Sequence, residues 1–378
     1  MDLLVRDLPA GRCGAALLRL GGLTEMTSIR LPGLVDVHVH LRDPGSEQKE
    51  DFTTGTRAAL AGGITTVLDM PNNPGAPTIT PSALDEKRAR AAARTCCDIG
   101  FHYGATPDNL GTFPAVTPSV FGLKLYLDHT TGSLLVERLD SMLDIFAAWP
   151  PDKPLLVHAE ERSVAAVLGL LAAAPRRVHF CHVSRGSEIR LIRAAKERGL
   201  PVTCEVAPHH LFLSDADLPR LGPYGMMKPP LRTGADVDAL WANLDVVDMV
   251  ATDHAPHTRA EKEVAAPAYG VPGLQTALPL MLTAVSEGRL SLDRLVELMA
   301  TAPRRVFAIP EQPETFVEID PDAAWEITDD QQLTKCGWTP FAGRRVRGHV
   351  QRVVLRGTEV MRDGVVSAEP GSGRVLTP

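Results

Sequence analysis

The stretch LPGLVDVHVHLRDPG, residues 31–45, contains the pattern from which the fold and the chemistry of the chain can be inferred. Val35 and Val37 alternate with polar residues, which is the two-residue period of a β-strand. Because His38 and His40 are two residues apart, their imidazoles leave the same face of that strand, separated by roughly 6.6 Å at a rise of about 3.3 Å per residue. Imidazole nitrogens are common ligands of zinc and its transition-metal neighbours. The stretch therefore predicts a strand with two metal ligands, although a surface strand with two incidental histidines fits the same pattern.

The strand pattern recurs along the chain and alternates with helix-like segments. The predicted strands are 34–40, 65–70, 98–105, 120–127, 154–160, 177–183, 201–206 and 248–254. The predicted helices between them are 51–61, 82–94, 134–148, 162–174, 188–198 and 236–244. Eight strands with intervening helices over about 220 residues fit the α/β class and a (β/α)8 TIM barrel better than an open doubly wound sheet. No G-x-G-x-x-G follows any of these strands, which weakens the dinucleotide-binding alternative.

The pattern changes on both sides of this region. Residues 1–32 are irregular and are predicted to be an N-terminal segment or linker. Residues 33–309 are predicted to form the barrel, which ends with helices at 273–286 and 291–299. Residues 310–378 contain short strands punctuated by the dipeptides Arg347-Gly348, Arg356-Gly357 and Asp363-Gly364. We therefore expect a small β appendage, formed by the N- and C-terminal segments, beside the barrel.

The composition argues against several classes of function. A net charge of −7 and a pI near 6.0 over 378 residues disfavour general nucleic-acid binding, which needs a basic excess. No apolar run reaches the roughly 20 residues that cross a bilayer, so no membrane partner is expected. The six cysteines form no C-x-x-C pair, which favours a reduced, cytoplasmic setting over a secreted one.

Residues with metal-binding side chains occur near the end of one predicted strand after another. They are His38, His40, Lys124, His158, His182, Glu205 and Asp253. Barrel enzymes carry their chemistry at the C-terminal ends of the strands, so we expect these side chains to meet at one rim. A single buried histidine is more often a hydrogen-bonded core residue, but chance does not readily bring a whole set to one place. The set predicts a metal centre at the mouth of the barrel.

Lys124 needs a separate explanation, because a free ammonium beside a cation is repulsive and burial disfavours its charged form. It alternates with Leu123, Leu125 and Leu127, so it points away from the leucines and toward the mouth. A neutral amine there can add carbon dioxide and become a carbamate, which is a carboxylate able to bridge two cations. The alternative is a lysine paired with an acid inside the barrel. We expect the carbamylated lysine.

These residues and several longer motifs resemble the binuclear-metal cyclic amidohydrolases, over nearly the whole chain from Arg30 onward. Within that superfamily, HVHLRDPG, MPNNP, LKLYL, CEVAPHHLFL and ATDHAPH look like dihydroorotase. The similarity is greatest to the dihydroorotase domain of animal multifunctional pyrimidine-synthesis proteins. The resemblance implies a homodimer and leaves open whether the natural chain continues into carbamoyl-phosphate synthetase and aspartate transcarbamoylase modules.

The resemblance also implies a binuclear zinc centre and a reaction. One Zn²⁺ would be held by His38, His40, carbamylated Lys124 and Asp253, and the other by Lys124, His158 and His182. The implied reaction is the reversible cyclisation of N-carbamoyl-L-aspartate to L-dihydroorotate with loss of water, in which Asp253 takes up and returns a proton. Two cations that share a water lower its pKa toward about 7, so hydroxide is available at neutral pH.

The small anionic substrate implied by the resemblance needs a carboxylate receptor. Arg42 follows His40 on the same strand face and can offer a bidentate fork, and Asn72 in MPNNP supplies an amide. His257 in HAPH is the third member that the family implies. Ordinary loop polarity is the alternative for Arg42 and Asn72.

Two other features bear on substrate binding. The loop that contains Thr130 and Thr131 resembles the mobile loop that closes over substrate in the family, where a threonine hydroxyl would contact the substrate. Lys228, in MKPPLR, occupies the slot in which the animal domains place a substrate-binding arginine, and Arg232 follows four residues later. Lysine keeps the charge of that arginine but loses its fork.

A third zinc site is an open alternative. The animal domains hold a third zinc near a Cys-His pair and the glutamate of CEVAPHH, and Cys181, His182 and Glu205 match those positions. Adjacent strand residues point to opposite faces, so Cys181 and His182 can share a site only if the strand has ended before them. A buried cysteine that packs as a small apolar residue is the other interpretation.

Two other functions remain open from the sequence. One is a different cyclic-amide hydrolase, such as a dihydropyrimidinase, hydantoinase or allantoinase, whose ring substrates lack the dihydroorotate carboxylate. A receptor made of Arg42 and Asn72 argues against it. The other is a non-catalytic scaffold paralogue. Such proteins typically lose metal-binding residues, and none is lost in this sequence.

Overall fold

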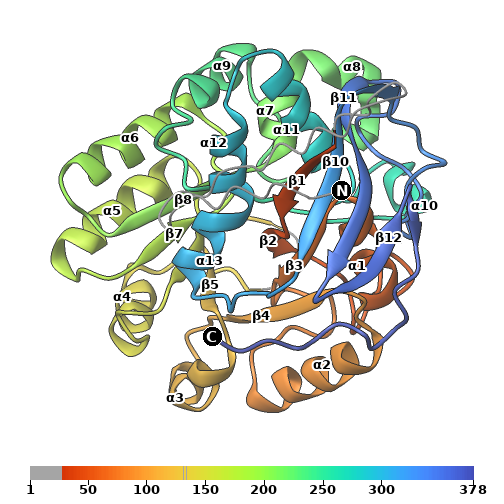
Figure 1. Ribbon diagram of the computed structural model, residues 1–378. Helices are drawn as coiled ribbons and strands as arrows, with labels where there is room; N and C mark the ends of the chain where they lie inside the picture. The colour runs from red at the N-terminus through yellow and green to blue at the C-terminus, as the bar shows by residue number, and fades with distance from the viewer. Residues whose placement is uncertain (1–27, 131, 133) are drawn as a thin grey trace, which may run out of the picture.

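The computed structural model describes residues 28–130, 132 and 134–378, so residues 1–27 of the predicted N-terminal segment and Thr131 lie outside the described residues. Its centre is a sheet of eight parallel strands in chain order, each hydrogen-bonded to the next (Figure 1). They are β2 (Leu34–Val39), β3 (Ile64–Asp69), β4 (Asp98–Gly104), β5 (Gly122–Tyr126), β6 (Leu155–His158), β7 (Val178–Phe180), β8 (Val202–Val206) and β9 (Met249–Val250). Beyond β9, His254 forms a parallel bridge with Val39, which closes the sheet. The predicted (β/α)8 TIM barrel is confirmed.

Helices form the layer outside the barrel (Figure 1). They are α1 (Phe52–Ala61), α2 (Pro81–Arg94), α3 (Phe113–Val116), α4 (Leu139–Ala148), α5 (Arg162–Ala173), α6 (Gly186–Glu197), α7 (Pro208–Phe212), α8 (Leu218–Leu221), α9 (Gly234–Ala242), α10 (Arg259–Lys262), α11 (Ala277–Ser286), α12 (Leu292–Val296) and α13 (Ala302–Phe307). Local sequence explains where the first two begin. Asp51 accepts a hydrogen bond from the Thr54 N–H ahead of α1, and Thr80 caps α2, whose first residue is Pro81. In the described part of the chain, no helix has both the length and the apolar character of a membrane span.

The helix predicted at 134–148 was placed too early. It begins only at Leu139, because the preceding residues pair with β5 instead. Leu135 forms a parallel bridge with Tyr126, and the Val136 N–H donates to the Tyr126 carbonyl. The chain therefore leaves the end of β5, returns to it, and only then enters the outer layer.

The last two predicted helices also differ from the structure. The one predicted at 273–286 begins at Ala277, after a turn in which the Gly273 carbonyl accepts from the Thr276 N–H at 3.2 Å. The one predicted at 291–299 is α12, which continues through a π-helical turn, η5 (Glu297–Thr301), into α13. Both differences concern helix ends, which local periodicity predicts poorly.

A five-stranded antiparallel sheet lies beside the barrel. Its order is β1 (Ile29–Pro32), β10 (Phe316–Glu326), β11 (Arg345–Leu355), β12 (Thr358–Arg362) and β13 (Val365–Val366). Because β1 pairs with β10, residues near the two ends of the chain share one sheet. The predicted β appendage formed by N- and C-terminal segments is confirmed. The dipeptides Arg356-Gly357 and Asp363-Gly364 separate its last strands, as predicted.

The turn predicted at Arg347-Gly348 is wrong, because both residues lie inside β11. Gly348 has a φ of 89°, and a Cβ added to it would lie 2.5 Å from Leu282 Cδ1 in α11. Glycine is needed here so that helix α11 can approach the strand, rather than for a chain reversal.

Candidate metal centre

The predicted metal ligands occupy the C-terminal ends of the barrel strands. His38, Lys124, His158 and Glu205 lie within β2, β5, β6 and β8, whereas His40, His182 and Asp253 lie just beyond β2, β7 and β9. All are buried, with exposed fractions from 0% for Lys124 to 8% for His40 and Asp253. The structure therefore brings the predicted side chains to one end of the barrel, as the strand order requires.

Two of these imidazoles converge on one carboxylate oxygen of a third residue, Asp253. The Nε2 atoms of His38 and His40 lie 3.3 Å and 3.0 Å from Asp253 Oδ1. Burial lowers the pKa of His40 to about 3, so its imidazole is neutral at pH 7. Burial opposes ionisation of Asp253, but the neighbouring His38 and His40 hold the pKa of its carboxyl below the usual range. These are the forms that bind metal. His38 differs, because although burial lowers its pKa, the Glu205 carboxylate raises it to about 10, so a cation would have to displace a proton from this ring.

His158 and His182 form a second pair beside the first three. His158 Nδ1 lies 2.9 Å from His182 Nε2, and burial lowers the pKa of both imidazoles. Two ring nitrogens at this distance either share one N–H or direct two lone pairs toward a cation. His182 Nδ1 is buried and has no hydrogen-bond partner among the described residues. Ligand atoms of His182, His38 and Asp253 lie within 4.8 Å of one another, so the two groups form one candidate centre.

Lys124 is fully buried beside these histidines. Its Nζ donates to Cys181 Sγ at 2.8 Å and lies 5.2 Å from the ring centre of Tyr126. No ion pair joins its ammonium to a carboxylate in the part of the chain that the structure describes. The alternative of a lysine paired with an acid therefore has no support, and the position is compatible with the carbamylation expected from the sequence.

The backbone turns sharply where two of the strands end. β7 ends at Phe180, so Cys181 and His182 both lie beyond it. His182 has a φ of 33°, and Asp253, beyond β9, has a φ of 48°. Left-handed backbone is costly for residues other than glycine and is concentrated at functional sites. Because the strand has already ended, Cys181 and His182 can both face the centre.

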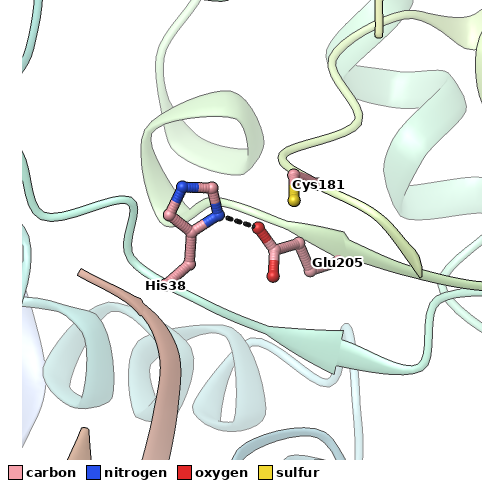
Figure 2. Close-up of side chains that lie close together, drawn as sticks. All are labelled: His38, Cys181 and Glu205. Atoms are coloured by element: carbon pink, nitrogen blue, oxygen red, sulfur yellow. Dashed lines mark hydrogen bonds and ion pairs between the residues drawn. The ribbon is translucent and has the colours of Figure 1, made fainter. Parts of the chain in front are cut away.

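Figure 2 shows a third group, in which His38, Cys181 and Glu205 point toward one another. His38 Nδ1 is hydrogen-bonded to Glu205, whose other oxygen lies 3.0 Å from His179 Nε2. Burial opposes ionisation of Glu205, but these two imidazoles hold its pKa well below the usual value. The expected third-zinc set needs a correction here. The ring in this group belongs to His38, because the ring of His182 is directed at His158 and only its backbone N–H reaches Glu205, at 3.2 Å.

Two supporting residues were not identified from the sequence. His179 alternates with Val178 and Phe180 within β7, so the strand pattern was a usable signal that its ring leaves the face opposite to theirs. Asp36 accepts hydrogen bonds from the His38 N–H at 3.1 Å and from Thr252 Oγ1 at 2.5 Å. Burial raises the pKa of Asp36 to about 7. These contacts join β2 to the segment after β9.

Arg42 and His257, two predicted substrate residues, are brought together. Arg42 Nη2 lies 3.2 Å from His257 Nε2, and the Tyr269 carbonyl lies 3.0 Å from the same nitrogen. Lys49 Nζ lies 3.3 Å from His257 Nδ1 and forms an ion pair with Glu261 at 2.7 Å. The Lys49 ammonium can only donate to Nδ1 and the Tyr269 carbonyl can only accept from Nε2, so the proton belongs on Nε2, and the Arg42 guanidinium, which is itself a donor, lies beside that N–H without a hydrogen bond to it. Burial, followed by the charges of Arg42 and Lys49, lowers the pKa of His257 to about 2.

The remaining predicted substrate residues lie in loops near the same end. Asn72 is buried and follows β3. A Cβ added to Gly132 would lie 3.6 Å from Asn72 Cβ, so the loop with half-buried Thr130 passes close to Asn72. Lys228 Nζ lies 5.1 Å from the ring centre of Tyr269. Thr131 lies outside the described residues.

Comparison with known sequences links this chain to one family. The sequence model of the Amidohydrolase family matches residues 29–120. The multifunctional protein CAD of Squalus acanthias is 51% identical over 348 residues, which are 92% of this chain and 15% of that protein. A dihydroorotase of Halobacterium salinarum is 38% identical over 377 residues, with 90% of this chain and 88% of the relative covered. The chain thus spans a small part of the multifunctional relative and most of the archaeal one.

Solved structures show the same architecture. An L-hydantoinase (dihydropyrimidinase) from Arthrobacter aurescens has a TM-score of 0.88 and 28% identity, with 93% of this chain and 89% of that chain covered. The inactive dihydroorotase-like domain of a Chaetomium thermophilum CAD-like multifunctional protein has a TM-score of 0.80 and 29% identity, with 93% and 99% covered. These two neighbours represent the two functional alternatives that the sequence left open.

Proposed function

Because the chain belongs to the dihydroorotases of the amidohydrolase family, we propose that it interconverts N-carbamoyl-L-aspartate and L-dihydroorotate. Cyclisation closes the ring with loss of water, as a step of de novo pyrimidine synthesis. The observation that supports this most strongly is the convergence of two ligand groups at the barrel mouth. His38, His40 and Asp253 form one, and His158 and His182 form the other.

The residues fit a binuclear zinc centre. His38, His40 and Asp253 would hold one Zn²⁺, His158 and His182 would hold the other, and a carbamate on Lys124 would be shared. His158 Nδ1 and His182 Nε2 lie close enough to ligate one cation together, and His182 Nδ1, which has no hydrogen-bond partner among the described residues, would then carry the proton of its ring. Imidazole-rich ligation favours zinc. When bound, the two cations would polarise the substrate carbonyl and lower the pKa of a water molecule toward about 7.

Asp253 would carry the proton transfers. Its pKa is held below the usual range, so it is ionised at pH 7 and able to accept a proton. In ring opening it would take the proton of the attacking water and return it to the departing ring nitrogen. In cyclisation the same carboxylate would deprotonate the attacking carbamoyl nitrogen and protonate the departing oxygen. The left-handed backbone at Asp253 orients this group toward the ligand histidines.

The substrate carboxylate would be bound opposite the reacting amide. Its receptor would consist of Arg42, Asn72, His257 and Lys228. Arg42 supplies charge and a fork, and His257 lies beside it with an Nε2–H that the Tyr269 carbonyl shares. Lys228 adds charge without a second fork, so it would contribute less direction than the arginine of the animal domains. The loop with Thr130 and Thr131 would close over bound substrate.

A third zinc would take Cys181, Glu205 and His38. His38 can serve two ions because its Nε2 faces Asp253 and its Nδ1 faces Glu205. Thiolate, imidazole and carboxylate are all zinc ligands.

The test is metal analysis combined with a dihydroorotate ring-opening assay on the wild-type chain and on Lys124→Ala. The wild-type chain should contain at least two zinc ions and open the ring. Lys124→Ala should lose metal and activity, and added short-chain carboxylates should restore part of the activity by replacing the carbamate. A wild-type chain that takes up no zinc, or that takes up zinc and does not open the ring, would overturn the proposal.

The structural similarity to a hydantoinase supports one second candidate function, the hydrolysis of another cyclic amide. Its substrates are uncharged rings, for which a guanidinium receptor has no use. Wild-type activity on hydantoin or dihydrouracil that survives Arg42→Met would favour that function. The inactive neighbour represents the non-catalytic scaffold, which the zinc measurement tests directly.

The context of the activity is also part of the proposal. Similarity to CAD over a small part of that protein supports a place in a larger chain with carbamoyl-phosphate synthetase and aspartate transcarbamoylase activities. We further propose a cytoplasmic homodimer, whose oligomeric state can be measured by light scattering.

A further inference from the structure

Arg232, from the motif MKPPLR, has no role in the proposed function, yet it is largely shielded from solvent at the barrel mouth, in the loop before α9. Its side chain is 10% exposed. Its Nη2 forms an ion pair with Glu160 Oε2, and its Nε donates to Ser184 Oγ at 3.2 Å. Glu160 lies two residues after His158, and Ser184 lies two residues after His182. One guanidinium therefore joins the loops that follow β6 and β7.

We propose that Arg232 is a positioning residue for the second metal ion, which holds the two loops so that His158 and His182 direct Nδ1 and Nε2 at the same cation. The inference rests on the proposed function, because it assumes that these two histidines bind zinc. It assigns Arg232 to zinc affinity rather than to substrate binding, although its motif also contains the substrate residue Lys228.

The ring nitrogens of His158 have different partners. Nδ1 lies 2.9 Å from His182, and Nε2 lies 3.6 Å from Glu160 Oε1. This distance is that of an ion-pair contact rather than a hydrogen bond, and Nε2 has no hydrogen-bond partner among the described residues. A carboxylate behind an imidazole favours the proton on the nearer nitrogen, which leaves the lone pair of Nδ1 for a metal. Glu160 therefore favours the ligating tautomer of His158 through its charge.

Arg232 in turn holds Glu160 in place. The two oxygens of Glu160 are divided, since Oε1 faces His158 and Oε2 faces the guanidinium. Without Arg232, the partly buried carboxylate is free to rotate toward solvent, and the orienting contact with His158 is lost. Because Arg232 Nε also binds Ser184, the same change loosens the segment that carries His182.

Arg232→Met should leave the fold intact, because the two loops have a second connection. Glu188 accepts hydrogen bonds from the Glu161 N–H at 2.9 Å and from the Ser184 N–H at 3.1 Å. The chain also offers a matched control. Arg185 forms an ion pair with Glu161 at 2.7 Å across the same two loops, with side chains 30% and 55% exposed. That pair makes no contact with His158 or His182 among the described contacts.

The experiment compares Arg232→Met, Arg232→Lys and Arg185→Met with the wild-type chain, using zinc alone as the probe. Zinc content is measured by mass spectrometry after dialysis, and affinity by competition with a chelator. Cobalt(II) replaces zinc for absorption spectra, which report ligand geometry. In Arg232→Met the second ion should bind about 10- to 100-fold more weakly, with an altered cobalt spectrum. The zinc affinity of Arg232→Lys should lie between those of the wild-type chain and Arg232→Met, because lysine keeps the charge without the fork. Arg185→Met should match wild type.

Unchanged zinc affinity and an unchanged cobalt spectrum in Arg232→Met would overturn the inference and leave the proposed function standing. An equal loss of zinc affinity in Arg185→Met would also overturn the inference, because any contact between the two loops would then have the same effect. A wild-type chain that binds no zinc would overturn both. Thermal unfolding of the metal-free chains should be alike in the two Met variants, and a loss of metal-free stability in Arg232→Met alone, with zinc affinity intact, would show a purely structural role.

Discussion

His158 Nδ1 lies 2.9 Å from His182 Nε2, and both rings are buried in the mouth of the barrel. Burial lowers the pKa of both imidazoles, so both rings are neutral near pH 7. Two neutral rings at this separation either share one N–H or direct two lone pairs toward one cation. The proposed function requires the second arrangement, and its consequences can be measured.

His158→Asn should remove one zinc ion from the chain. It should also lower ring-opening activity by more than about 100-fold, because loss of a ligand costs more than the 10- to 100-fold typical of a residue behind one. Metal analysis and steady-state kinetics measure both effects. His349→Asn, in β11 of the appendage, is the control and should keep full zinc content. Two zinc ions retained in His158→Asn would contradict the ligand assignment.

Lys49→Met should weaken substrate binding without removing metal. Lys49 Nζ contacts His257 Nδ1 at 3.3 Å and keeps the proton on Nε2, beside Arg42. Without it, Nδ1 loses its donor, and the Tyr269 carbonyl is left as the contact that holds the ring and the Nε2 proton in place. KM for dihydroorotate should rise about 10-fold, equivalent to about 1.4 kcal/mol, with kcat largely retained. Lys335→Met is the control, because Lys335 is an exposed lysine paired with Asp51 at 2.6 Å. A fall in kcat or zinc content with unchanged KM would contradict this role.

His257 should make the protein less stable in acid. Its pKa is about 2 in the folded chain, against an ordinary value of 6.5, so below pH 6.5 the unfolded chain binds a proton that the folded chain does not. Its contribution is fully present above that pH and is lost as pH falls, by up to about 1.4 kcal/mol per pH unit. His257→Gln should reduce the pH slope of stability, measured by urea unfolding of metal-free chains between about pH 6.5 and 4.5. Equal slopes in the two chains would show that His257 is not the buried neutral group.

Gly348→Ala should destabilise the contact between α11 and the appendage. The added Cβ would lie 2.5 Å from Leu282 Cδ1, and overpacking of this kind costs about 1–3 kcal/mol. Gly364→Ala is a matched control, because Gly364 has a similar φ of 80° and no atom within 4 Å of the added Cβ. The two substitutions then cause similar backbone strain, and they differ only in the steric clash of the added Cβ. Urea unfolding should show the larger loss for Gly348→Ala, and similar losses would mean that α11 moves aside freely.

Much of the barrel was predictable because its signals are local. The alternation around His38 and His40 depends on neighbours in sequence, and so do the hairpin turns at Arg356-Gly357 and Asp363-Gly364. Arg347-Gly348 shows where this fails, since the same dipeptide type serves helix packing there instead of a turn. A local pattern cannot distinguish a glycine needed for chain reversal from one needed for close approach.

By itself, the sequence determined the order of eight strands, the polar residues at their ends and the membership in the dihydroorotases. Only the tertiary structure decided which partner each imidazole nitrogen faces. It directs His38 rather than His182 at Cys181 and Glu205, and it places Glu160 and Arg232 behind His158. These relations join segments far apart in the chain. They exist only because the barrel closes and the backbone turns left-handed just past β7 and β9, which no sequence period encodes.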